Sequence, residues 1–100
     1  MSTTIFRAGS VNTLSEMRRD IMLLMTERGK SQQGTVHCYF VEKTLRIGTG
    51  HTILEFDFSS IKGQKNTVEH IAAALTVLHE YCLREHLLLD DLISAVDLLN

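Results

Sequence analysis

The fold is decided by residues 35–58, which read TVHCYFVEKTLRIGTGHTILEFDF. Successive side chains of a β-strand point to opposite faces of a sheet, so alternate residues share a face. Apolar side chains recur at alternate positions in 36–40 and in 54–58, and a shift of phase near Glu42–Thr44 indicates a turn or a bulge. The run Gly48-Thr49-Gly50 is typical of a hairpin. This stretch therefore predicts three antiparallel strands with one apolar face.

The other face of this predicted sheet is more polar. His37, Tyr39 and Val41 alternate with the apolar set of the first strand, and Glu55 and Asp57 alternate with that of the last strand. Outward carboxylates of this kind usually solvate the free face of an antiparallel sheet. The apolar face needs a second layer to cover it, so we expect helices on that side.

Two amphipathic segments can form this helical layer. The first begins at Thr13, which with Glu16 fits a capping box, and should end near Gly29. The second, longer helix should begin with Asn66 as its N-cap and Glu69 at the third position, and should end near residues 85–86. Their apolar stripes have helical spacing: Leu14, Met17, Ile21, Leu24 and Met25 in the first, and Val68, Ile71, Ala72, Leu75, Leu78 and Cys82 in the second.

Segments near both ends of the chain complete the expected fold. Thr3–Ala8 is a candidate strand, and residues 90–91 are aspartates that can cap a short terminal helix. The apolar positions of that helix are Leu92, Ile93, Val96 and Leu99. We therefore expect residues 1–100 to form a single compact α+β domain in the order β-α-β-β-β-α-α. It would be a two-layer sandwich, with a three- to four-stranded, mainly antiparallel sheet covered by two helices plus the short C-terminal helix.

Composition excludes several classes of protein. The chain is 44% hydrophobic and 22% charged, which are ordinary values for a globular domain. Its two cysteines are too few for a disulfide framework. No basic segment followed by an apolar run opens the chain, and no apolar stretch approaches the ~20 residues of a membrane span. We therefore expect a cytoplasmic protein with reduced thiols that does not enter a membrane.

Catalysis and metal binding have weak support. His79, Cys82 and His86 are the only group that resembles metal ligands, but seven helical residues rise ~10.5 Å, too far for all three to meet one ion. The alternative is that Cys82 packs in the core, where a thiol is also inert as a nucleophile. The sequence contains no other reaction signature. We therefore expect neither an enzyme nor a cofactor, and no metal site.

Surplus apolar residues point instead to contact with another protein. Nine of the last fourteen residues are Leu, Ile, Val or Ala, and the long helix has a second apolar stripe that includes Ala73, Ala74, Val77 and Tyr81. The terminal helix could cover this stripe by folding back, or a second copy could cover it in a homodimer. An acidic face formed by Glu69, Glu80, Glu85, Asp90 and Asp97 would suit a basic partner, as in a small inhibitor or adaptor. The residues predicted to bind a partner are Glu69, Ala73, Val77, Glu80, Tyr81, Glu85, Leu88, Asp90, Leu92, Val96, Asp97 and Leu99.

A nucleic-acid-binding module is the alternative. Residues 1–50 contain seven Lys or Arg and four Asp or Glu, whereas residues 51–100 contain three and eight. A basic edge could be formed by Arg18, Arg19, Arg28, Lys30, Lys43 and Arg46, with Tyr39 as a stacking platform. Glu55 and Asp57 place negative charge on the same sheet face, and the pI near 6.2 lacks the usual basic footprint. Protein binding is therefore the preferred prediction.

Overall fold

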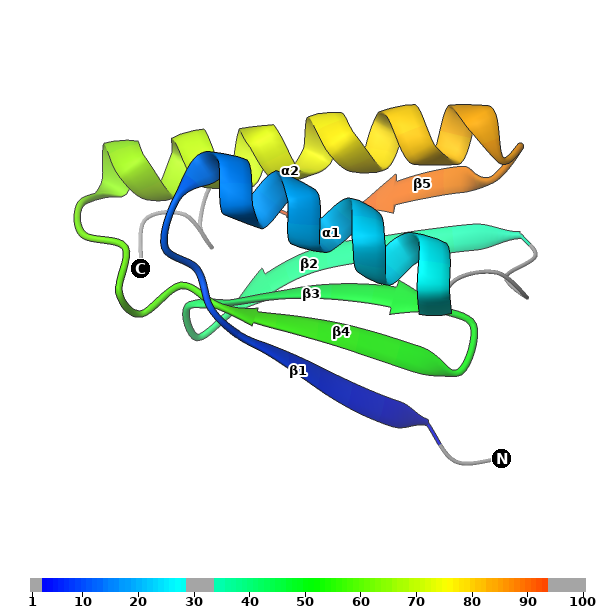
Figure 1. Ribbon diagram of the computed structural model, residues 1–100, viewed down its shortest axis with the longest axis horizontal. Helices are drawn as coiled ribbons and strands as arrows, with labels where there is room; N and C mark the ends of the chain where they lie inside the picture. Colours follow the sequence, from blue (N-terminus) through cyan, green and yellow to red (C-terminus); the bar gives the residue numbers. More distant parts are fainter. Residues whose placement is uncertain (1–2, 29–33, 94–100) are drawn as a thin grey trace.

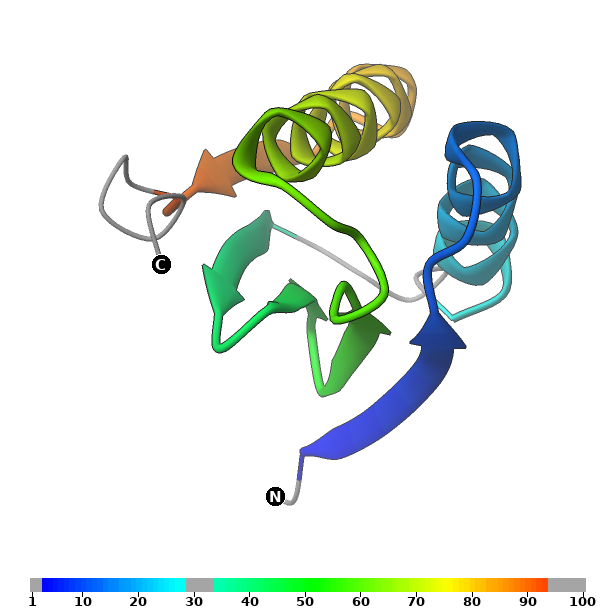
Figure 2. The same ribbon diagram turned by 90° about the vertical axis from the view of Figure 1, so that its left-hand side faces the viewer.

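A computed structural model describes residues 3–28 and 34–93. In this part of the chain five strands and two helices follow one another in the order β-α-β-β-β-α-β (Figure 1). They are β1 (Thr4–Ser10), α1 (Leu14–Arg28), β2 (Thr35–Val41), β3 (Thr44–Thr49), β4 (Thr52–Asp57), α2 (Gln64–Arg84) and β5 (Leu88–Asp91). The strands form one mixed sheet in the order β1-β4-β3-β2-β5. Both helices lie on the same face of this sheet, α1 above its β1 side and α2 above its β5 side (Figure 2).

The antiparallel meander β2-β3-β4 confirms the alternation of residues 35–58. Its first turn is made by Glu42 and Lys43, which both have positive φ angles, of 50° and 59°. Its second turn lies at Gly50 and His51, between the paired residues Thr49 and Thr52. The turn at 42–43 explains the shift of phase in the sequence, because the direction of the chain reverses there.

The core lies between the sheet and the two helices. The stripe predicted for α1 is confirmed, and the hydroxyl of Thr13 accepts a hydrogen bond from the Glu16 N–H at 3.2 Å, as the capping box predicts. α2 begins at Gln64, two residues before the predicted N-cap. Asn66 instead donates its amide N–H to the Lys62 carbonyl at 2.9 Å. Fully buried side chains come from every layer and include Met17, Ile21, Met25, Leu45, Ile47, Leu54, Phe58 and Leu78.

The α+β class is confirmed, but the prediction of a three- to four-stranded, mainly antiparallel sheet was wrong, because the sheet has five strands and β1 pairs with β4 in parallel. The predicted end of the fold was also wrong. Leu88–Asp91 is a fifth strand parallel to β2, and residues 3–28 and 34–93 contain no third helix. The Leu92 N–H continues the pairing by donating to the Cys38 carbonyl at 2.9 Å. Pairing with β2 satisfies the backbone groups of this segment, whereas a helix cap at Asp90-Asp91 would leave the edge of β2 open. Val96, Asp97 and Leu99, also assigned to that helix, lie outside the described residues.

The interpretation of the second apolar stripe on α2 is also corrected. Ala73, Val77 and Tyr81 are buried inside the domain, and the Tyr81 hydroxyl donates to the Met25 carbonyl of α1 at 3.1 Å. α2 contacts both the sheet and α1, so it needs a wider apolar arc than a helix with one neighbour. These three residues are therefore unavailable for the homodimer contact predicted from the sequence, and the oligomeric state stays a prediction.

Replacing Tyr81 with phenylalanine should lower the free energy of unfolding by about 1 kcal/mol, because the ring remains but its buried hydrogen bond is lost. Urea denaturation followed by circular dichroism measures this difference. Tyr39→Phe is the matched control: Tyr39 is only half-buried on the opposite face of the sheet, so loss of its hydrogen bond to Arg46 should cost less than loss of the buried bond of Tyr81. Equal costs for the two variants would contradict the role assigned to the Tyr81 hydroxyl.

Candidate functional site

The face of the sheet opposite the helices has no covering layer among the described residues (Figure 2). Its side chains stand in rows across the strands, set by the register of the ladders. One row contains Ile5, Ile53, Gly48, His37 and Asp90, in the order β1-β4-β3-β2-β5. Glycine in the middle of this row leaves the centre of the sheet without a side chain.

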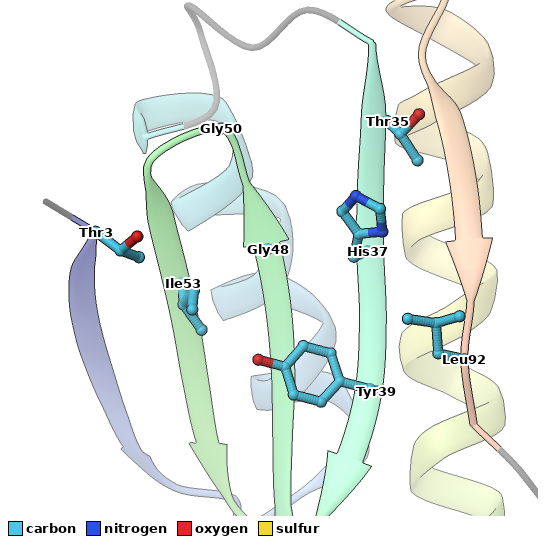
Figure 3. A pocket seen from close by; sticks show the side chains of 8 residues that line it. All are labelled: Thr3, Thr35, His37, Tyr39, Gly48, Gly50, Ile53 and Leu92. Atoms are coloured by element: carbon cyan, nitrogen blue, oxygen red, sulfur yellow. The ribbon is translucent and has the colours of Figure 1, made fainter. Parts of the chain in front are cut away.

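A hollow of about 530 Å³ lies over this gap (Figure 3). A Cβ atom on Gly48 would lie 3.7 Å from the His37 Cβ and 3.8 Å from its carbonyl oxygen, which are ordinary contacts. The φ angle of Gly48 is not positive, so the backbone does not require glycine here. Gly48 therefore differs from other residues at this position in the space that it leaves, and not in its backbone conformation. The hollow is lined by Thr3, Thr35, His37, Tyr39, Gly48, Gly50, Ile53 and Leu92.

A charged row borders the hollow. The Glu55 carboxylate, almost buried, lies between two arginines: its Oε1 is 3.4 Å from the Arg7 Nε and its Oε2 is 2.8 Å from the Arg46 Nε. Arg46 also forms a side-chain hydrogen bond with Tyr39. Desolvation by itself lowers the pKa of the Arg46 guanidinium, but the bond to Tyr39 and the charge of Glu55 raise it overall. This row holds Tyr39 at the side of the hollow (Figure 3).

His37 and Asp90 form a polar pair on the β2–β5 side. The His37 Nδ1 lies 3.3 Å from the Asp90 Oδ2, and both side chains are about half exposed. A carboxylate that orients a histidine also occurs in hydrolases, where the histidine activates a nucleophile. The described residues that line this hollow include no serine or cysteine. Cys38 is buried, and this burial, with the charge of Asp91, raises the pKa of its thiol to about 12. His37 and Asp90 therefore place a polar, hydrogen-bonding pair on the β2–β5 side of the hollow.

The residues considered for a metal site do not come together. Cys82 is buried and burial raises the pKa of its thiol, whereas His79 and His86 are exposed. Among residues 3–28 and 34–93, no group of three or more His, Cys, Asp or Glu side chains is arranged to hold a metal ion. His86 lies beyond the end of α2 with a φ angle of 58°, so the helical spacing used in the sequence argument does not apply to it.

The predicted acidic face is divided between two sides of the molecule. Glu69 and Glu80 are exposed on α2 and, being eleven residues apart, share one side of the helix; Glu85 is exposed just beyond its end. Asp90 lies instead on the sheet, opposite His37. The prediction of one continuous acidic surface through Asp90 was wrong, because β5 carries this residue away from the helix layer.

Two leucines predicted to bind a partner do lie on the open sheet side. Leu92 lines the hollow and is 53% exposed, and Leu88 is 70% exposed beside Thr35. Of the other predicted contact residues, Ala73, Val77 and Tyr81 are buried, Glu69 and Glu80 are exposed on α2, and Glu85 is exposed at its end. The structure thus brings Leu88, Leu92 and Asp90 together, but separates them from Glu69 and Glu80.

The predicted basic surface is divided as well. Arg18 and Arg19 are exposed on α1 in the helix layer, whereas Tyr39 and Arg46 lie on the free face of the sheet. Lys43 is in the β2–β3 turn. Lys30 and the side chain of Arg28 lie outside the described part. The described basic residues therefore do not form the single edge expected for a nucleic-acid-binding surface, and Arg46 is already paired with Glu55.

Comparisons with known proteins give no relative. No family model, no curated protein and no solved structure matches this chain. Within the described residues, neither helix combines the length and the apolar character needed to cross a membrane. The hollow was not predicted from the sequence, although a signal was present: Gly48 interrupts an otherwise regular strand pattern, and a strand glycine often marks a close approach by another molecule.

Proposed function

We propose that this protein is a non-catalytic protein-binding module that takes an apolar or aromatic side chain of its partner into the hollow over Gly48. The observation that carries this proposal is the combination of an uncovered sheet face with a gap at its centre. Ile53 and Leu92 offer apolar contact to such a side chain, and Tyr39 offers a ring for stacking. Binding sites of this kind place an anchor in a pocket and surround it with polar groups.

The apolar surface extends beyond the hollow, which supports a protein partner over a small molecule. Ile5 is 47% exposed next to Ile53, and Leu88 is exposed beyond Leu92. Exposed apolar residues grouped around a hollow mark a contact surface in many soluble proteins. The hollow would hold the anchor residue, and these outer side chains would contact the residues around it.

Filling the hollow tests the proposal. Gly48→Val should leave the fold intact or stabilise it, because valine favours strands and the Cβ atom meets no close neighbour. Among peptides selected from a random display library against the wild-type protein, at least one should bind Gly48→Val at least tenfold more weakly, the equivalent of about 1.4 kcal/mol. Binding is measured by fluorescence polarisation, and the fold of the variant by its amide NMR spectrum.

Thr44→Val is the matched control, because it adds valine to the same strand and face but outside the hollow. It should bind the selected peptides as the wild type does. If every selected peptide bound Gly48→Val and the wild type equally, the proposal would be refuted. A wild-type dimer that becomes a monomer on Gly48→Val would identify a second copy of this chain as the partner.

A further inference from the structure

Strand β1 offers a second surface, on the opposite edge of the sheet from β5. β1 pairs with β4 on one side, and no described strand lies on its other side. An edge strand presents backbone N–H and C=O groups that can pair with a strand of another chain. Asp90 and Asp91 place charge on the short strand at the other edge, β5, which disfavours pairing there. β1 is therefore the more accessible edge.

An apolar groove follows the β1 edge on the helix side. It has a volume of about 230 Å³ and lies under α1, which stands above this edge (Figure 2). Leu23, 51% exposed, forms part of its wall although it belongs to a helix that already packs on the core. The lining residues are Phe6, Ala8, Asp20, Leu23 and Leu24. A strand added to β1 would direct alternate side chains into this groove.

The flank of α1 above the groove is acidic. Asp20 and Leu23 line the groove, and Glu16 and Glu27 share their side of the helix within about 60° of arc. Arg19 pairs with Asp20 at 3.7 Å, but both side chains are exposed and such a pair contributes little. Glu16 and Glu27 are separated by ~16 Å of helical rise, close to the ~13 Å between residues i and i+4 of a strand.

We propose that β1 binds an extended basic segment of a partner protein, which adds a strand to the sheet beside the α1 groove. In this partner segment, alternate residues would face α1: a basic residue, a large apolar residue and a second basic residue. The apolar residue would occupy the groove between β1 and Leu23, and the cations would meet the carboxylates of α1. A second copy is disfavoured as occupant, because two-fold pairing of β1 with itself would bring two acidic flanks together.

The probe is a set of four capped peptides, Thr-Lys-Thr-Φ-Thr-Lys-Thr, in which Φ is Val, Leu, Phe or Tyr. At least one should bind the wild-type protein, measured by fluorescence polarisation, and should slow hydrogen exchange of the β1 amides. The peptide with Glu in place of both Lys should not bind. Two N-methylated versions of the peptide, one methylated at odd positions and the other at even positions, should behave differently. Only one of them should lose binding, because alternate residues of a strand direct their N–H groups toward the same neighbouring strand.

Charge and groove variants locate the contact. Asp20→Lys and Leu23→Ala should each weaken binding at least tenfold, whereas Glu80→Lys, the same type of charge reversal on exposed α2, should change it less than twofold. The proposal would be overturned if none of the four peptides bound, if both N-methylated versions bound, or if Glu80→Lys weakened binding as much as Asp20→Lys. A dimer whose β1 amides are protected without peptide would also overturn it. The hollow over Gly48 is not involved, so Gly48→Val should bind these peptides normally.

Discussion

Replacing Phe58 with alanine should lower the free energy of unfolding by about 3–5 kcal/mol, because a large buried side chain is removed and a cavity remains. Phe58 follows β4 and is 1% exposed. Its ring centre lies 5.4 Å from that of Phe40 and 6.2 Å from that of His70, both in edge-on geometry, so the substitution removes contacts to the sheet and to α2 together. Domains of this size are stable by about 5–15 kcal/mol, so the variant should be close to unfolding.

Guanidinium denaturation followed by circular dichroism measures this effect. Phe58→Leu keeps most of the volume and should cost about 1–2 kcal/mol, while Leu83→Ala, at a position 81% exposed, should cost less than 0.5 kcal/mol. If Phe58→Ala were no more costly than Leu83→Ala, the central position of Phe58 in the core would be wrong.

Raising the pH should destabilise the protein through Cys38. Burial first, and the charge of Asp91 second, raise the pKa of its thiol from 9.0 to about 12. Between these values the unfolded chain loses the proton and the folded protein keeps it, so the unfolded state binds fewer protons and stability falls as the pH rises. The contribution of Cys38 is fully present below pH 8, and about 3 kcal/mol of it should be lost by pH 11.

Cys38→Val provides the comparison, because valine fills a similar buried volume and does not titrate. Free energies of unfolding of both proteins should be measured in steps from pH 7 to pH 11. The other titrating groups are common to both, so the wild-type stability should fall more steeply than that of Cys38→Val above pH 9. Parallel curves would show that the Cys38 thiol is accessible to solvent in the folded protein.

The two proposed surfaces would allow the protein to act as an adaptor. The hollow over Gly48 lies on the free face of the sheet, and the groove lies on the helix side of the β1 edge. The charged row of Arg7, Glu55 and Arg46 lies next to the hollow on the free face, and its charges are largely paired with one another. One partner could therefore occupy the hollow while another adds a strand to β1.

Local patterns in the sequence were sufficient for most of the elements. The alternation in 35–58 predicted the meander and which side chains face the helices, because a period of two is a property of a single strand. The spacing of Met17, Ile21 and Met25 predicted α1 and its buried face for the corresponding reason in a helix. These elements follow from residues close together in the chain, and the structure confirms them.

Tertiary structure decided the rest, because it depends on which distant segments meet. Leu88–Asp91 became a strand since β2 offered it backbone partners, and Ala73, Val77 and Tyr81 became core since α2 packs against α1 as well as the sheet. The hollow exists because Ile53 and His37 flank Gly48 in neighbouring strands, a juxtaposition set by ladder register. The sequence by itself determined the periodicity of each element; only the pairing of strands and helices determined which residues were left on a surface to bind a partner.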